Sequence, residues 1–434
     1  CIASRARGNV LIVTSSHVSS GQWHSQLRDW FDVRGGHIVT LDESMDMQSV
    51  TVLRERIVQN TPTLCIATYT RLTASQKHTA VARCALAGLK AMEYQVIILD
   101  EAQCVPADCF RRVAALCYHS IIGLSATFMR EDNKQQLFER IIGPMLIDIP
   151  CSELVDASLI ARVDRHTLIV PYPQCWKRLS LSYSQTQLAC VINPFKLNCV
   201  ISLLRYHLGR GEHIMVFCDN LAALHEMHRI VSQCAGLRAF GPLCMRTANR
   251  NEMIQQFRRT EPGAVLFVSK VGDIAIDIPE VSVLIQTSTF NSSRNQAAQR
   301  DGRAARICPG GASEASTPNT EVEVSHSYSI VGEASLEIAH NDRREAHMAQ
   351  QGSLHATYRA TDADLPEHVR KALDASDAEE FETCAARMIP LIQRVGTVVA
   401  VTKRTSAPKA SRLKKKVCFR GGNAPPFGSR SRVP

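Results

Sequence analysis

Continuous apolar runs alternate with stretches of helical spacing along the first third of the chain. Such runs lack the polar positions of a half-exposed strand and predict strands covered on both faces, which we expect at residues 9–14, 63–69, 96–99 and 121–127. Between the runs, apolar residues recur three and four positions apart, as do Trp23, Leu27 and Trp30. Strands that alternate with helices predict a parallel, doubly wound α/β sheet.

The alternation restarts in the second half of the chain. Buried strands are expected at residues 213–219, 264–270 and 281–288, an alternating strand at 321–331, and helices at 221–233 and 333–352. Five prolines interrupt the stretch in between, residues 128–198. This punctuation predicts an irregular connector with a small inserted element between two α/β lobes.

These patterns divide the chain into five parts. The first lobe takes residues 1–150, a connector takes 151–198, and the second lobe takes 199–360. Residues 361–400 are acidic and predict one or two short helices. Residues 401–434 are basic and rich in Ser, Pro and Gly, which predicts a disordered tail.

Bulk composition is that of an ordinary globular protein, with 45% apolar and 21% charged residues. No run approaches the roughly 18 uncharged residues of a membrane span. The 16 cysteines include no Cys-x-x-Cys, so neither a disulfide framework nor a zinc site is indicated, and a reducing compartment is expected. The chain starts with Cys1 rather than Met, which indicates a fragment or a processed chain.

The net charge of +9 resides in the tail. Residues 401–434 hold ten Lys and Arg and no acid, which leaves 40 basic against 41 acidic residues in the rest of the chain. Bulk charge therefore neither supports nor excludes a nucleic-acid groove in the folded part. Within the tail, residues 411–416 (SRLKKK) are similar to a basic nuclear-localisation cluster, a pattern that also arises by chance.

Asp100 and Glu101 directly follow the apolar run at 96–99. In open α/β sheets, ligands bind at the carboxyl ends of the strands. Two adjacent acids there suit a nucleoside triphosphate site, where one carboxylate binds the Mg²⁺ that bridges the phosphates and the other positions or activates the attacking water. The alternative is a strand end with two solvated acids.

A second group of constrained residues lies at 299–306 (QRDGRAAR), and it follows the pattern Q-R-x-G-R-x-x-R. Arginines three positions apart, such as Arg303 and Arg306, share a helical face. Pointed across a cleft, they can stabilise negative charge in the transition state of phosphoryl transfer. A charged, solvated helix is the alternative.

Two weaker patterns stand at other strand ends. Gly272 and Asp273 follow the strand at 264–270, but Gly-Asp is also ordinary turn chemistry. Ser125 and Thr127 supply hydroxyl groups at the end of the strand expected at 121–127, and the same hydroxyls are typical of helix caps.

Taken in order, DEAQ, GLSAT, SKVGD and QRDGRAAR resemble the core of superfamily 2 helicases and translocases. GLSATFMRED, with Arg130, Glu131 and Asp132 like a RED loop, and FVSKVGDIAIDIPEVSVLIQTS are closer to the xeroderma pigmentosum group B family of DNA helicases. The resemblance covers about residues 1–355. It implies two RecA-like lobes and an ATP-dependent DNA helicase or translocase that acts in nucleotide excision repair and transcription initiation.

The resemblance also implies cofactors, partners and a location. ATP and Mg²⁺ would be the cofactors, and DNA, double-stranded or forked, the substrate. Subunits of a transcription factor IIH-like complex would be the protein partners, and the nucleus the compartment. No membrane association is expected.

Roles for single residues follow from the matching positions. Asp100 would bind Mg²⁺, Glu101 would polarise the attacking water, and Gln103 would link the nucleotide to the second lobe. Ser125 and Thr127 would couple hydrolysis to lobe movement. The residues at the nucleotide from the second lobe would be Gly272, Asp273, Gln299, Arg303 and Arg306, and those at the DNA would be Ser15, Ser16, Thr68, Arg130, Glu131 and Asp132.

Three features depart from the family pattern. Gln103 stands where close relatives usually have His, and the expected thumb-like insertion, about residues 168–195, is short and poorly matched. No G-x-x-x-x-G-K-[ST] phosphate loop occurs in the 434 residues. We therefore expect an N-terminally truncated motor that is inactive alone, whose strand at 96–99 has an unpaired edge.

Two alternatives remain open. The chain can be a catalytically inactive paralogue that serves as a DNA- or partner-binding module. It can also be another superfamily 2 motor, of the restriction or RNA-acting type.

Overall fold

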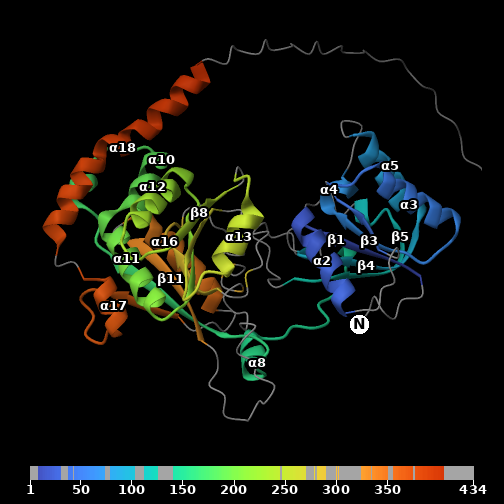
Figure 1. Ribbon diagram of the computed structural model, residues 1–434, viewed down its shortest axis with the longest axis horizontal. Helices are drawn as coiled ribbons and strands as arrows, with labels where there is room; N and C mark the ends of the chain where they lie inside the picture. The colour runs from blue at the N-terminus through green and yellow to red at the C-terminus, as the bar shows by residue number, and fades with distance from the viewer. Residues whose placement is uncertain are drawn as a thin grey trace, which may run out of the picture.

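The computed structural model describes residues 8–30, 38–42, 44–73, 79–102, 112–125, 140–244, 247–269, 278, 281–289, 300, 302, 324–333, 335–349, 355–374 and 377–404. Within them the chain forms two parallel β-sheets, each covered by helices (Figure 1). One sheet belongs to the N-terminal half of the chain and the other to the C-terminal half. This confirms the predicted α/β class with two doubly wound lobes.

The first lobe contains five described strands with helices between them: β1 (Asn9–Thr14), α2 (His17–Trp30), β2 (Ile38–Leu41), α3 (Met47–Val58), β3 (Leu64–Thr68), α4 (Tyr69–Leu72), α5 (Ala80–Ala91), β4 (Glu93–Leu99) and β5 (Cys117–Gly123). The strand order is β2-β3-β1-β4-β5, and all pairs are parallel. The carboxyl ends of these strands therefore meet at one edge of the sheet.

The apolar run of β1 forms a strand with both faces buried. Leu11 and Val13 pack into a core on one face of the sheet, and Val10 and Ile12 pack into a core on the other. This alternation is the period of two that a strand imposes on its side chains. Side-chain caps start the covering helices, since Asp46 accepts from the Ser49 N–H at the start of α3.

The second lobe follows α8 (Cys151–Asp156). Its elements are β6 (Arg162–Val170), α9 (Gln174–Lys177), α10 (Tyr183–Ile192), α11 (Pro194–Gly209), β7 (His213–Phe217), α12 (Leu221–Ser232), β8 (Ala239–Leu243), α13 (Arg250–Arg258), β9 (Val265–Val268), β10 (Val281–Gln286), β11 (Val324–Gly332), α16 (Leu336–Ala349), β12 (His355–Arg359), α17 (Glu367–Ala372) and α18 (Ala378–Arg404). The strand order is β12-β6-β11-β10-β7-β9-β8, again parallel.

The structure differs from the expected connector at residues 151–198. β6 pairs with β11 along its whole length and with β12 on its other side, so it is an inner strand of the second sheet. Trp176 of α9 and Leu188 of α10 are buried in the core of the same lobe, within the segment expected to be a thumb-like insertion. The sequence pattern missed β6 because its first half, RVDRHT, mixes charged and apolar residues and is only partly covered.

The acidic segment 361–400 also packs on the second lobe. The Trp176 Nε1–H donates to the Ala385 carbonyl at 2.9 Å, which joins α9 to α18. α18 continues to Arg404, four residues into the segment expected to be a tail, and residues 405–434 lie outside the described part. The other domain limits stay predictions.

The strand that carries the two acids has no open edge. β4 lies between β1 and β5, so the expected unpaired edge at 96–99 is wrong. The outermost strand on that side is β5, in which every residue keeps some exposure.

Among the described residues, no helix by itself is long and apolar enough to cross a membrane. α10 and α11 reach that length and apolarity only jointly, across a bend of 41°, and most of their apolar side chains are buried in the core of the second lobe.

Candidate functional site

Asp100 and Glu101 lie where β4 ends, between the ends of β1 and β5. The Asp100 N–H donates to the Val13 carbonyl at 2.9 Å, so the β1–β4 ladder continues to the first acid. The Tyr69 hydroxyl donates to the Asp100 carbonyl at 2.7 Å. The backbone of Asp100 is thus fixed by a neighbouring strand on one side and by α4 on another.

The Asp100 carboxylate is oriented by two neutral donors. Trp23 Nε1–H of α2 donates to Oδ2 at 2.9 Å, and the Glu101 N–H donates to Oδ1 at 3.1 Å. Neutral donors hold a carboxylate in place without cancelling its charge. The side chain is half-buried, so a cation that approaches this edge of the sheet meets an ordered anion.

Glu101 has a backbone conformation that favours glycine. Its φ is +48°, in the left-handed region, where a residue with a Cβ loses about 1–2 kcal/mol. Strain of this kind at a strand end is typical of functional sites. Gly123 packs tightly beside this turn, because a Cβ there would lie 3.0 Å from the Ile142 Cδ1 and 3.2 Å from the Ala102 Cβ, so a larger residue would require these side chains to shift.

A second acid at the same edge was missed by the sequence analysis. Asp42 follows β2, is 3% exposed, and accepts hydrogen bonds from the N–H and Oγ of Ser44. His17 Nδ1 lies 2.7 Å from its Oδ2. Burial raises the pKa of Asp42, but the hydrogen bonds from Ser44 and His17 outweigh it and leave the pKa below its usual value. Ser44 is a local partner, but His17 belongs to α2, so no local pattern indicates the contact between His17 and Asp42.

The predicted hydroxyl residues of the first lobe have different surroundings. The Ser16 hydroxyl accepts from the Ser19 N–H at 3.2 Å at the start of α2, and Ser15 beside it is half-buried. Ser125 is exposed. Thr68 has a fully buried side chain, so this structure does not present its hydroxyl to a bound strand.

Ten predicted site residues lie outside the described part of the chain, and their roles stay predictions. They are Gln103, Thr127, Arg130, Glu131, Asp132, Gly272, Asp273, Gln299, Arg303 and Arg306.

At the carboxyl edge of the second sheet, buried ion pairs take the place of accessible acids. Lys196 of α11 contacts both oxygens of Glu337 at 2.8 Å, and both side chains are fully buried. Arg300 Nη2 lies 2.8 Å from Asp219 Oδ1 just past the end of β7. The sequence analysis assigned no role to these four residues, because the partners are far apart in sequence.

Asp100 fits the demands of a magnesium ion. Mg²⁺ keeps several waters and is usually held by one or two carboxylates together with substrate phosphates. Each Asp100 oxygen accepts one hydrogen bond, which leaves a further lone pair for a water of the ion. Over the residues that the structure describes, no group of three or more His, Cys, Asp or Glu side chains could hold a metal without a substrate.

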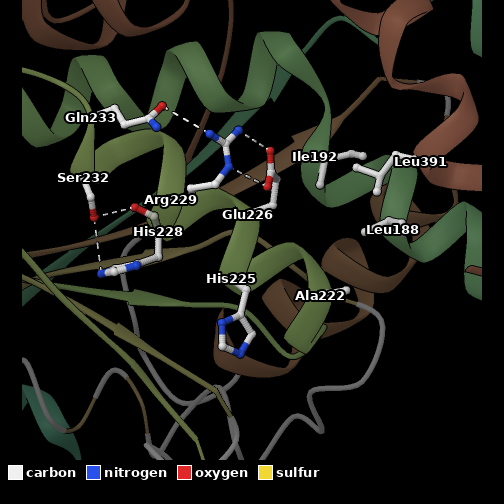
Figure 2. A pocket seen from close by; sticks show the side chains of 10 residues that line it. All are labelled: Leu188, Ile192, Ala222, His225, Glu226, His228, Arg229, Ser232, Gln233 and Leu391. Carbon is white, nitrogen blue, oxygen red and sulfur yellow. Dashed lines mark hydrogen bonds and ion pairs between the residues drawn. The ribbon is translucent and has the colours of Figure 1, made fainter.

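A hollow of about 630 Å³ lies away from both strand edges, between α10, α12 and α18 (Figure 2). Leu188, Ile192 and Leu391 form its apolar side. On the other side Arg229 pairs with Glu226 at 2.7 Å and donates to Gln233. The charged side chains Arg229 and Glu226 pair with each other along α12, so they do not point together into the hollow as the polar groups of a binding site would.

Comparison with known proteins agrees with the fold and shows the family. The family described as ERCC3/RAD25/XPB C-terminal helicase matches residues 154–384. The chain is 30% identical over 353 residues to a Danio rerio protein named general transcription and DNA repair factor IIH helicase/translocase subunit XPB. It is 30% identical over 370 residues to the protein of that name from Drosophila melanogaster.

These alignments cover 81% and 83% of this chain but 42% and 43% of the relatives, so the chain spans about two fifths of their length. Among solved structures, the DEAD-box helicase Mss116 bound to ssRNA and UDP-BeF matches with a TM-score of 0.51 and 15% identity. That match covers 89% of this chain and 72% of the other, and it supports the two-lobed fold. The match of the family over more than half of the residues identifies this chain as a member of the ERCC3/RAD25/XPB helicase family.

Proposed function

We propose that this chain is the motor core of an ATP-dependent DNA helicase or translocase of the XPB type. The observation that carries the proposal is the pair Asp100–Glu101 at the carboxyl end of β4. Neutral donors orient Asp100 and leave its charge available, and Glu101 occupies a left-handed backbone conformation. Membership of the helicase family, shown by a match over residues 154–384, supports an ATP-dependent motor in general.

In the proposed reaction, Asp100 would hold the magnesium ion of bound ATP, and the ion would supply positive charge against the phosphates. Glu101 orients the attacking water and polarises it. Gln103 links the nucleotide to the second lobe, and Ser125 and Thr127 couple hydrolysis to lobe movement.

From the second lobe, Arg303 and Arg306 stabilise negative charge on the γ-phosphate as it departs, with Gln299 beside them. Gly272 and Asp273 face the same nucleotide from the loop after β9. The second lobe thereby contributes positive charge at the nucleotide.

DNA is the proposed substrate. Ser15 and Ser16 follow β1 at the edge where α2 begins, and their hydroxyls suit contacts to phosphates, which track a strand without reading its sequence. Arg130, Glu131 and Asp132 grip or separate the strands. The names of the relatives support partners in a factor IIH-like complex and roles in transcription and DNA repair. Nucleotide excision repair, transcription initiation and a nuclear location are further parts of the proposal.

One sequence feature favours a second candidate, a catalytically inactive binding module. The 434 residues contain no G-x-x-x-x-G-K-[ST], the loop whose backbone N–H groups and Lys cradle nucleotide phosphates. We therefore propose that this chain alone binds ATP weakly and does not turn it over. A longer version of the chain that includes a phosphate loop encoded by the same gene is called the phosphate-loop version below. ATP turnover by this version supports the motor, and the lack of such a loop in the gene supports the binding module.

The test is DNA-stimulated ATP turnover of a phosphate-loop version with Arg306→Ala. Removing an arginine finger lowers turnover about 10³-fold or more. Arg229→Ala is the matched control, because Arg229 lies on the surface of the same lobe and pairs only along α12. If Arg306→Ala keeps turnover within tenfold of the parent, the proposed site is wrong.

A further inference from the structure

His17 presents an exposed imidazole at the carboxyl edge of the first sheet. It follows Ser15 and Ser16 after β1, and its side chain is 55% exposed, whereas those two residues are half-buried. Ligands of parallel α/β sheets bind at this edge. The sequence pattern assigns His17 no role, so its chemistry follows from its contacts alone.

A buried carboxylate fixes one ring nitrogen of His17. The Nδ1 atom lies 2.7 Å from Asp42 Oδ2, and the Asp42 side chain is 4% exposed. Burial raises the pKa of Asp42, but hydrogen bonds from Ser44 and His17 hold it below its usual value, so the group is a carboxylate that only accepts. The imidazole therefore donates through Nδ1–H, which leaves Nε2 for a ligand.

Asp42 is itself held at both its side chain and its backbone. Its Oδ1 accepts from the Ser44 N–H at 2.9 Å and from the Ser44 hydroxyl at 2.6 Å. Arg71 of α4 donates to the Asp42 carbonyl through Nε at 2.9 Å. The acceptor for the imidazole thus has a fixed position, and a ligand group that is oriented beforehand loses less conformational entropy on binding.

Stability alone is a weak reason for this arrangement. Ion pairs with an exposed partner contribute little to the free energy of unfolding. More than half of the His17 side chain is exposed, and no residue in the described part of the chain forms a hydrogen bond with its Nε2. Histidines that act on ligands are commonly oriented in this way, with one nitrogen bound to a carboxylate and the other available.

The donors of the imidazole suit a phosphate. A doubly protonated imidazole has two N–H donors and no acceptor, so with Nδ1–H on Asp42 the Nε2–H can donate to an anionic oxygen. The other predicted contacts to the DNA backbone are less accessible, since Thr68 is buried and the Ser16 hydroxyl accepts from the Ser19 N–H. His17 therefore supplies an exposed N–H donor that these two residues do not.

We propose that His17 is a further DNA contact of the first lobe, whose Nε2–H donates to a phosphate of the bound strand, and that Asp42 is its positioning residue. This inference rests on the proposed function, because it names a residue that would hold the DNA of the motor. The contact reads no base and is independent of DNA sequence. Asp42 touches no DNA and acts through the imidazole.

The experiment measures the affinity of the full chain for a labelled oligodeoxythymidine at several salt concentrations, together with the thermal midpoint of each variant. His17→Asn places an amide N–H near the position of Nδ1, so it can keep the bond to Asp42, but it has no donor at the position of Nε2. We expect its affinity at low salt to fall about fivefold, the upper range for an exposed ionic contact. Its salt slope should lose about 0.7, the share of one phosphate on a single strand.

Two further variants separate the contact from its support. His17→Gln places its amide near the position of Nε2 and should keep more affinity than His17→Asn, although it loses the bond to Asp42. Asp42→Asn keeps the shape of the side chain but removes the charge that faces the imidazole, so it should weaken binding in the same direction. His24→Ala is the matched control, because His24 lies about two turns further along α2 and should bind DNA like the parent.

The outcomes distinguish this contact from the proposed function. A loss of affinity and slope in His17→Asn at a parental thermal midpoint supports the contact. If folded His17→Asn keeps the affinity within twofold and the parental slope, or if His17→Gln binds no better than His17→Asn, the contact is wrong. The proposed function then stands as long as the parent binds DNA, and a parent that does not bind DNA overturns both.

Discussion

Asp100, at the carboxyl edge of the first sheet, is held in the opposite way to Asp219 and Glu337 near the carboxyl edge of the second. In the first lobe, Asp100 accepts hydrogen bonds from an indole and a backbone N–H, and it stays half-buried. In the second lobe, Glu337 is fully buried against Lys196, and Asp219 against Arg300. The same position in the same kind of sheet thus supports two uses of a carboxylate.

The group that contacts the carboxylate decides whether its charge is available to a ligand or used in the fold. A neutral donor orients a carboxylate and leaves its charge for a ligand, whereas a buried cation consumes that charge in the fold. The position of an acid at a strand end is therefore not enough to assign it a role in ligand binding or catalysis. Asp100 is thereby available to a metal ion, whereas Glu337 and Asp219 use their charge in the packing of the second lobe.

The largest stability effect is expected for Lys196→Met. It leaves the buried Glu337 carboxylate without its cation, and removing one partner of a buried pair costs about 3–5 kcal/mol. Burial already raises the pKa of Glu337 despite the attraction of Lys196. Calorimetry should show the second lobe unfolding earlier while the first lobe is unchanged.

Lys371→Met is the control for that experiment, because Lys371 pairs with Glu367 in full exposure and should change little. The double variant Lys196→Met/Glu337→Leu should recover much of the loss. A cost below about 1 kcal/mol for Lys196→Met would show that the pair does not brace the lobe.

Acid should weaken the second lobe selectively. Burial, together with neighbouring histidines, lowers the pKa of His166 to about 4, and the same causes lower that of His368 to about 4. Histidines with a lowered pKa favour folding above their ordinary value near 6.5, and this contribution is lost as pH falls from there through 4.

His166 lies among titratable neighbours, so its protonation adds positive charge close to other histidines, and Asp164 offsets that charge only in part. It stacks on Tyr328 at 5.0 Å and lies 5.8 Å from His326 and from Tyr358, measured between ring centres. Thermal midpoints at pH 7.0, 5.5 and 4.5 should fall for the second lobe more than for the first, where His119 is exposed. Equal slopes in the two lobes would contradict this.

A smaller effect is expected in the first lobe for Trp23→Phe. The variant keeps the ring's packing but removes the donor to Asp100, and a hydrogen bond to a charged group contributes about 1.5–3 kcal/mol. Gln26→Ala on the exposed face of α2 is the control. The first lobe should lose stability and ATP turnover should fall, whereas an unchanged Trp23→Phe would show that Asp100 needs no orientation.

The smallest effect on either lobe is expected from deleting residues 405–434. These residues hold eight Lys and Arg and no acid, so their contacts to DNA are phosphate contacts. DNA affinity should fall at low salt and converge with the parent at high salt, with both unfolding midpoints and ATP turnover unchanged. Loss of turnover would place the tail inside the motor.

Local pattern was enough for much of the first lobe. β1, β3 and β4 are continuous apolar runs buried on both faces, and such runs need no distant information. β2 and β12 were missed because they are short and partly exposed, and β6 because charged residues interrupt its first half. Edges of a sheet tolerate polar residues, so their pattern weakens.

The site shows the same limit. Asp100 and Glu101 were predicted because ligands bind where the strands of a parallel sheet end. The residues that contact acids at these sheet edges, however, are distant in the sequence. Trp23 is 77 residues from Asp100, and Lys196 is 141 residues from Glu337. Contacts across such distances depend on how helices pack on the sheet, which no local spacing encodes.

The most direct test of this account is ATP turnover by Glu101→Gln in a phosphate-loop version, with Glu93→Gln as control. Glu93 is an exposed acid at the other end of β4, so both variants remove one negative charge from the same strand. Glu101→Gln should bind ATP with unchanged affinity and lose turnover by about 10³-fold, while Glu93→Gln behaves like the parent. Turnover by Glu101→Gln within tenfold of the parent would contradict the assignment of this edge as the catalytic one.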